Sequence, residues 1–188
     1  MKQHKGCRSV IDRKSLHRLV SSVVGSDEPI NYLEFGVAAG DTLNMWLTMN
    51  LSEKSIFYGF DTFKGIPEQW GKHQKGTFSQ FGLTPKIDDS RAHLIKGMFQ
   101  ETLPEFIAAY SSKKPVVVHM DADLYSSTLY CLTMLDQIMV SGTIIIFDEF
   151  YDLLHEFSAF NDYIRSYYRS YEVLASMKNF SKIAIRIL

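Results

Sequence analysis

The chain has 188 residues, of which 46% are hydrophobic, and 20 Lys and Arg against 21 Asp and Glu leave a formal net charge of −1. This near-neutral charge argues against a protein that binds nucleic acid or an anionic membrane by neutralising phosphates. No apolar run approaches the ~20 residues that span a bilayer, and no signal-peptide core follows the basic start at residues 1–5, so we expect a cytoplasmic protein. The length predicts a single domain over residues 1–188, with an N-terminal helical segment over residues 1–25.

Short β-rich runs alternate along the chain with longer runs of helical periodicity. In chain order, the pattern predicts a helix over 16–24, a strand over 30–35, a helix over 41–51, strands over 55–60 and 92–96, a helix over 101–111, a strand over 115–120, a helix over 126–139, a strand over 142–147, a helix over 153–168, and strands over 173–177 and 183–188. Strands that alternate with helices are typical of an α/β fold whose mostly parallel central sheet has helices on both faces. The last two strands are close in sequence, which predicts an antiparallel C-terminal edge.

The segment 62–90 interrupts this alternation. It carries several glycines and prolines together with aromatic residues, among them Trp70, Phe78 and Phe81. A loop of this length within a compact domain is typical of a lid or a binding segment. We expect its aromatic residues to stack on a ligand as readily as to pack against the protein.

A glycine turn and an acidic residue follow the first two strands of the predicted parallel sheet. Gly36 and Gly40 flank a tight turn that leads into a helix, and Asp61 ends the next strand. Ligands of open α/β sheets bind at the carboxyl ends of the strands. An acid about 20 residues beyond the glycines can accept hydrogen bonds from both hydroxyls of an adenosine ribose. This pair is compatible with a nicotinamide dinucleotide or with S-adenosylmethionine.

Three carboxylates follow two later strands, Asp121 after one and Asp148 and Glu149 after the other. Side chains that converge in this way repel one another unless a cation lies among them. No Lys or Arg adjoins them in sequence, so we expect at least one raised carboxyl pKa without metal. Their oxygen ligands favour Mg²⁺ or a similar ion, and the alternative is that they cap the following helices.

Short segments in order between residues 31 and 161 carry a family resemblance. They are Tyr32–Val37, Gly59–Pro67, Lys75–Ser79, Lys96–Pro104, His119–Thr128 and Phe147–Phe150. This ordered set resembles the macrocin O-methyltransferase (TylF-like) group of class I methyltransferases. The resemblance implies a Rossmann-like methyltransferase sandwich, S-adenosylmethionine as methyl donor, a divalent metal that is usually Mg²⁺, and methyl transfer to a hydroxyl of a sugar or similar polyol.

By position, the resemblance also implies which residues form the site. Cofactor contacts are expected from Glu34, Phe35, Gly36, Val37, Gly40, Thr42, Asp61, Thr62, Phe63, Gly97, Met98, Phe99 and Asp121. The metal ligands would be Asp121, Asp148 and Glu149, and the catalytic residues Asp121, Asp148 and His155. A metal that chelates two neighbouring hydroxyls would lower the pKa of the attacking one, with a carboxylate or His155 taking the proton. The segment 62–90 would then be the lid over the acceptor.

The acceptor does not follow from the resemblance, because the chain lacks the Trp-containing insertion that many relatives carry after the second acidic pair.

Two other functions remain open at this point. The first is a non-catalytic protein that binds S-adenosylmethionine. The carboxylates at the strand ends argue against it, because such a protein needs no metal site. The second is a nicotinamide-dependent oxidoreductase, for which the full G-x-G-x-x-G fingerprint is lacking. We expect a small-molecule hydroxyl acceptor, no nucleic-acid or membrane partner, and leave a homo-oligomer open.

Overall fold

The computed structural model describes residues 7–188. The basic start at residues 1–5 and the first six residues of the predicted N-terminal segment therefore lie outside the described residues. Over the part of the chain that is described, no helix has the length and apolar character needed to cross a bilayer.

A single sheet of eight strands forms the centre of the fold, in the order β1-β7-β8-β6-β5-β2-β3-β4. The strands are β1 (Arg8–Val10), β2 (Asn31–Phe35), β3 (Ile56–Asp61), β4 (Ala92–Lys96), β5 (Val116–Met120), β6 (Ile144–Phe147), β7 (Tyr171–Met177) and β8 (Ile183–Ile187). The five strands from β4 to β6 are parallel, whereas β8 is antiparallel to both β6 and β7. The predicted antiparallel C-terminal hairpin is thus confirmed. Beyond it lies β1, which the sequence did not predict and which pairs parallel with β7.

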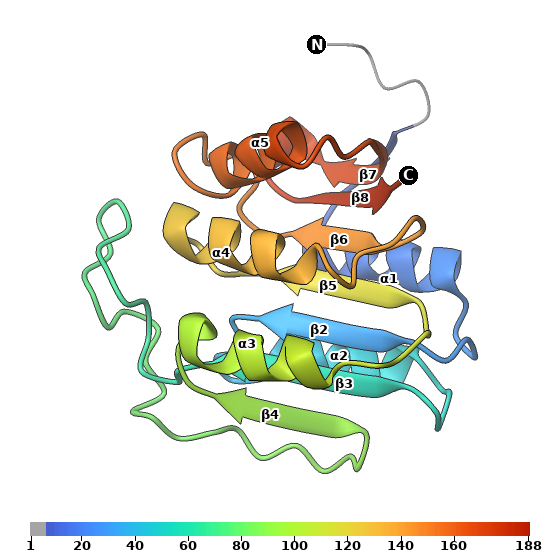
Figure 1. Cartoon of the computed structure of the whole chain (residues 1–188), viewed down its shortest axis with the longest axis horizontal. Helices are drawn as coiled ribbons and strands as arrows, with labels where there is room; N and C mark the ends of the chain where they lie inside the picture. The colour runs from blue at the N-terminus through green and yellow to red at the C-terminus, as the bar shows by residue number, and fades with distance from the viewer. Residues whose placement is uncertain (1–6) are drawn as a thin grey trace.

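Helices cover both faces of this sheet, as Figure 1 shows. They are α1 (Arg13–Val24), α2 (Asp41–Met49), α3 (Phe99–Ala109), α4 (Tyr125–Leu135) and α5 (Glu156–Ser166). Leu103, Leu132 and Phe160 place α3, α4 and α5 against one face in a shared core, while Leu16 and Trp46 place α1 and α2 in the core of the other face. Because successive side chains of a strand point to opposite faces, each buried central strand contributes to both cores.

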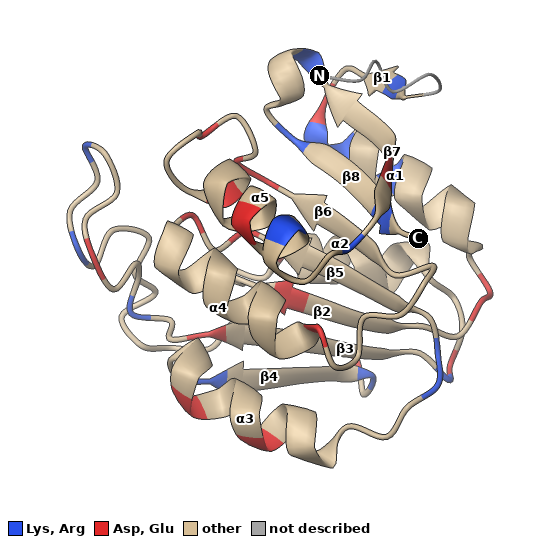
Figure 2. Ribbon diagram, turned by 45° about the horizontal axis from the view of Figure 1, so that its top comes forward, with Lys and Arg blue, Asp and Glu red and all other residues tan. Residues whose placement is uncertain are grey.

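The carboxyl ends of β2, β3, β4, β5 and β6 all lie along one edge of the sheet, since these strands are parallel. The predicted loop 62–90 extends beyond the arrowheads of these strands (Figure 1) and holds no helix or strand, only an isolated bridge between Trp70 and His73. Acidic positions colour the ribbon near the arrowheads of the central strands in Figure 2. The fold therefore places the chemistry-bearing residues of the sequence analysis at one edge.

Candidate active site

The turn after β2 brings the main chain of two neighbouring strands unusually close. Gly36 has φ +92°, and a Cβ atom there would lie 1.9 Å from the carbonyl oxygen of Asp121. The Asp121 N–H donates to the Phe35 carbonyl at 2.9 Å, and the Gly36 N–H donates to the Phe60 carbonyl at 3.0 Å. Only glycine fits this approach, because any side chain would collide with backbone that cannot move aside. The close contact sets the end of β2 directly beside the first predicted catalytic aspartate.

Asp61 holds this turn in place through its carboxylate. One oxygen, Oδ2, accepts the N–H groups of Val37 at 2.9 Å and Ala38 at 2.8 Å, and Oδ1 accepts the N–H of Phe63 at 2.7 Å. A carboxylate offers about four lone-pair positions, so three are already used within the protein. The carboxylate therefore has about one position left for a ligand hydroxyl, where the sequence predicted two bonds.

A cavity of about 570 Å³ opens at this edge of the sheet, within the range of small-molecule sites. Its wall combines the glycine turn, the strand ends and the aromatic loop. The lining residues are Gly36, Ala38, Asp61, Thr62, Gly65, Ile66, Pro67, Trp70, His73, Phe78, Met98, Phe99, Asp121, Ala122, Asp123, Ser127, Glu149 and Tyr151.

The three predicted metal ligands converge, but two basic residues from distant parts of the chain lie among them. Arg13 reaches from the start of α1 with Nη2 at 2.8 Å from Oδ2 of Asp121 and Nε at 2.9 Å from Oδ1 of Asp148. Lys182 places Nζ at 2.5 Å from Oδ2 of Asp148 and at 3.7 Å from Oε1 of Glu149. No Lys or Arg adjoins these carboxylates in sequence, but folding brings Arg13 and Lys182 to the cluster.

The pKa values divide the carboxylates into two kinds. Burial and the charge of Asp148 raise the pKa of Asp121, and burial raises that of Glu149. Burial alone would also raise the pKa of Asp148, but His119, Arg13 and Lys182 outweigh it and hold this pKa below its usual range. Burial and the neighbouring charge of Asp148 thus favour the protonated forms of Asp121 and Glu149, whereas Asp148 itself stays ionised.

A buried histidine connects Asp148 to the end of β2. His119 on β5 lies 3.6 Å from Glu34 through Nδ1 and 3.6 Å from Asp148 through Nε2, and the hydroxyl of Tyr32 donates to Glu34 at 2.7 Å. Burial opposes the charge of His119, yet the two carboxylates outweigh it and raise its pKa to about 10. The two carboxylates therefore favour the protonated form of His119, which adds a third positive charge near Asp148.

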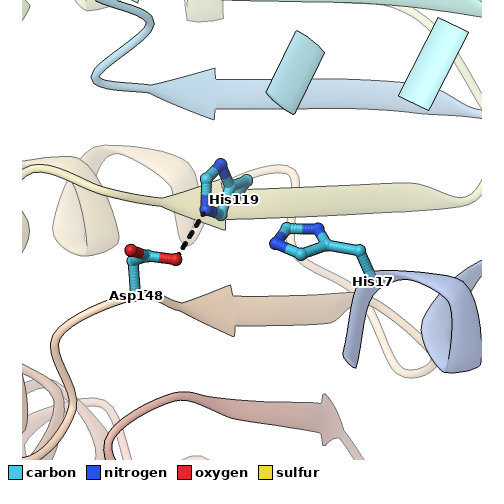
Figure 3. Close-up of side chains that lie close together, drawn as sticks. All are labelled: His17, His119 and Asp148. Carbon is cyan, nitrogen blue, oxygen red and sulfur yellow. Dashed lines mark ion pairs between the residues drawn. The ribbon is translucent and has the colours of Figure 1, made fainter. Parts of the chain in front are cut away.

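A second cluster with metal-ligand spacing lies behind the cavity, where His17 reaches from α1 towards His119 and Asp148 (Figure 3). The Trp46 indole N–H donates to Nδ1 of His17 at 2.9 Å. Indole is a donor only, so neutral His17 carries its hydrogen on Nε2 and has no lone pair there for a metal. Burial keeps His17 neutral by lowering its pKa to about 2. This cluster is part of the packing between α1 and the sheet.

The structure places about half of the predicted site residues on the cavity wall. Those on it are Gly36, Asp61, Thr62, Met98, Phe99, Asp121 and Glu149. The other predicted site residues do not line the cavity: Glu34, Phe35, Val37, Gly40, Thr42, Phe63, Gly97, Asp148 and His155. Glu34 is buried against Tyr32 and His119, and Nδ1 of His155 accepts the N–H of Tyr125 at the start of α4. Their assigned roles stay predictions.

Among the wall residues that were not predicted as catalytic, cofactor or metal residues, three have titratable side chains: His73, Asp123 and Tyr151. Asp123 has φ +58°, an unusual conformation for a residue other than glycine. Burial, together with the charges of Asp121 and Glu149, raises the pKa of Asp123 to about 8. The Asp-x-Asp spacing after β5 was a signal that could have identified it, whereas His73 and Tyr151 lie in irregular segments without such a signal.

The strand order, the antiparallel C-terminal hairpin and the cavity at the carboxyl ends are those of the class I methyltransferase fold. Residues 71–184 match the family described as Macrocin-O-methyltransferase (TylF), which is more than half of the chain. The chain therefore belongs to the TylF family and is an S-adenosylmethionine-dependent O-methyltransferase. The family assignment favours neither a non-catalytic scaffold nor an oxidoreductase. A comparison with curated proteins found no match.

Solved structures show the same fold. CalS11, described as a calicheamicin methyltransferase, matches with a TM-score of 0.66 and 21% identity over 92% of this chain and 76% of that one. The O-methyltransferase NovP matches with a TM-score of 0.69 and 20% identity over 92% and 79% of the two chains. A structure described as cmcI-D160 Mg-SAM matches with a TM-score of 0.62 and 15% identity over 94% and 72%.

Proposed function

We propose that this enzyme transfers the methyl group of S-adenosylmethionine to a hydroxyl of a sugar or other polyol small molecule. The observation that carries the proposal is the cavity wall, where the glycine turn and Asp61 meet the carboxylates Asp121 and Glu149 beneath an aromatic loop. The acceptor class is supported by a structural relative at 21% identity, CalS11, which is described as a TDP-rhamnose 3′-O-methyltransferase.

In this proposal the cofactor lies along the glycine turn. Gly36 lines this part of the cavity, and the remaining acceptor position of Asp61 takes one ribose hydroxyl. Met98 and Phe99, which follow β4, flank the adenine, and Thr62 lines the same wall. The predicted residues behind the wall support these contacts: Glu34, Phe35, Val37, Gly40, Thr42, Phe63 and Gly97. Val37 gives an example, because its N–H donates to the carboxylate of Asp61 and so orients it.

The loop 62–90 forms the acceptor side of the cavity and serves as its lid. Trp70, His73 and Phe78 form one aromatic group, with ring centroids 5.3 Å apart for Trp70 and His73 and 5.2 Å apart for His73 and Phe78. The Trp70 indole donates to Asp152 at 3.0 Å, which ties the loop to the segment after β6. All three rings line the cavity and offer an apolar surface to one face of a sugar ring. Phe81, by contrast, is 92% exposed and lies outside the lining.

The predicted divalent ion belongs to this proposal, and the donor set fits it. Asp121, Asp148 and Glu149 offer only oxygen atoms, and among the described residues Oδ1 of Asp148 is a buried atom without a hydrogen-bond donor. An ion held there would act as a Lewis acid on the acceptor hydroxyl. The relative described as Mg-SAM supports magnesium as that ion.

The chain's own residues would carry out the remaining steps. Asp121 on the wall accepts the hydroxyl proton, and the oxygen attacks the sulfonium methyl in line. The C–S bond breaks as the C–O bond forms, which yields a methyl ether, S-adenosylhomocysteine and one proton. Asp148 holds Lys182 and His119 in place beside the cluster. His155 is the second candidate base, but its Nδ1 is occupied by the Tyr125 N–H, so neutral His155 carries its hydrogen on Nε2 and is suited to donate.

A screen of nucleotide sugars, free sugars and polyols for S-adenosylhomocysteine release tests the proposal. We expect release with a hydroxylated acceptor, dependent on Mg²⁺, and heat of binding with S-adenosylmethionine but not with NAD. Binding of S-adenosylmethionine without methyl transfer to any member of the panel would contradict the acceptor class. Binding of NAD alone would contradict the cofactor.

A further inference from the structure

We propose that Arg13 is an internal counter-ion that competes with a divalent metal for Asp121 and Asp148, so that metal binding requires its guanidinium to leave. The proposal rests on the proposed function only in placing a divalent ion at these carboxylates. It concerns the affinity of the site for that ion and not the identity of the acceptor.

The guanidinium of Arg13 occupies the space between the two carboxylates. It bridges them from one side chain, with Nη2 at 2.8 Å from Asp121 and Nε at 2.9 Å from Asp148. A metal that used both aspartates as ligands would have to lie between them, where this positive charge now stands. Two cations cannot share that position without strong repulsion. Arg13 and the metal therefore exclude each other.

The contact with Asp148 is incomplete, which makes Arg13 displaceable. Among the described residues, Nε of Arg13 and Oδ1 of Asp148 are both buried polar atoms without a hydrogen-bond partner, although they lie 2.9 Å apart. The two opposite charges therefore attract each other, but Nε and Oδ1 form no hydrogen bond. A hydrogen bond requires alignment of donor and acceptor as well as a short distance. At Asp121, by contrast, Nη2 of Arg13 does donate a hydrogen bond to the carboxylate.

Lys182, the other cation of the cluster, is held more firmly. Its Nζ donates both to the carbonyl oxygen of Asp148 at 2.8 Å and to Oδ2 at 2.5 Å, and its side chain is 17% exposed. The side chain of Arg13 is 38% exposed and lies at the first residue of α1, so it can turn into solvent while the helix stays packed. Lys182 therefore remains in place, and Arg13 is the group that exchanges with the metal.

Mn²⁺ binding to the protein without S-adenosylmethionine or acceptor tests the inference directly. The free Mn²⁺ signal in electron paramagnetic resonance measures the dissociation constant for the wild type, for Arg13→Gln and for the control Arg18→Gln. Arg18 is exposed on the same helix, so both variants remove one positive charge from α1. We expect Arg13→Gln to bind Mn²⁺ at least tenfold more tightly than the wild type and Arg18→Gln to change affinity less than threefold. Unchanged or weaker binding by Arg13→Gln overturns the proposal.

A second measurement on the wild type guards against a variant that folds poorly. Phenylglyoxal modifies exposed guanidinium groups, and mass spectrometry reports the rate at each arginine. Saturating Mg²⁺ should increase the modification rate at Arg13 several-fold and leave that at Arg18 unchanged. An unchanged or reduced rate at Arg13 overturns the proposal, even if S-adenosylhomocysteine release confirms the methyltransferase activity.

Discussion

Replacing Asp61 removes the anchor of the glycine turn and a predicted ribose contact in one step. In Asp61→Ala three backbone donors, on Val37, Ala38 and Phe63, lose a charged acceptor. Each hydrogen bond to a charged group contributes roughly 1.5–3 kcal/mol. Water in the cavity can replace part of this loss at Ala38, which lines the cavity, but little at Val37 and Phe63, which are both buried. We therefore expect the free energy of unfolding to fall by about 3 kcal/mol.

Asp61→Asn separates the two roles. The side-chain oxygen can keep the two N–H groups now bound to Oδ2, whereas its amide group would face the N–H of Phe63. The unfolding free energy should then fall by only about 1–2 kcal/mol. Loss of one charge-assisted bond to the ribose should weaken cofactor binding by roughly 10- to 100-fold in this variant.

Urea denaturation and isothermal titration with S-adenosylmethionine measure both effects. Asp88→Asn is the matched control, because Asp88 is an exposed aspartate in the loop 62–90. If Asp61→Asn binds the cofactor within threefold of the control, the ribose assignment is wrong. If Asp61→Ala is as stable as the control, the carboxylate does not hold the turn.

Three further predictions concern the metal, the lid and the buried histidine. Activity should vanish in EDTA and return with Mg²⁺, and full activity in EDTA would remove the metal from the proposal. Asp121→Asn should lower kcat by orders of magnitude and change the cofactor dissociation constant far less. Limited proteolysis should cut the loop 62–90 in the free enzyme and more slowly with cofactor and acceptor bound, so equal rates would contradict a lid. The pKa of His119 is raised to about 10, so the folded state binds an extra proton from about pH 6.5 to pH 10, and the unfolding free energy should fall as pH rises through that range. Urea titrations should show a flatter dependence in His119→Gln over the same range, and an identical slope would contradict the charged state.

Much of the fold followed from the sequence because its signals are local. The alternation of apolar runs with helical periodicity predicted the helices and all strands but β1, which has three residues and too little apolar pattern to be recognised. The parallel order of the central strands then required that Asp61, Asp121 and Asp148 meet at one edge, since parallel strands share the direction of their carboxyl ends. The sequence itself determined this convergence and the glycine turn at Gly36, whereas the close approach of the Asp121 carbonyl to Gly36 came from the structure.

Only the tertiary structure decided what surrounds these residues. Arg13 lies 108 residues before Asp121 and Lys182 lies 34 residues after Asp148, so no local pattern could reveal that they neutralise this cluster. The alternation of side chains along β2 likewise directed Glu34 towards His119, where the fold brings two groups distant in sequence into an ion pair. Local sequence specifies the secondary structure and the type of each side chain. The charge balance of the site depends instead on contacts that form only after α1 has packed against the sheet and β8 has paired within it.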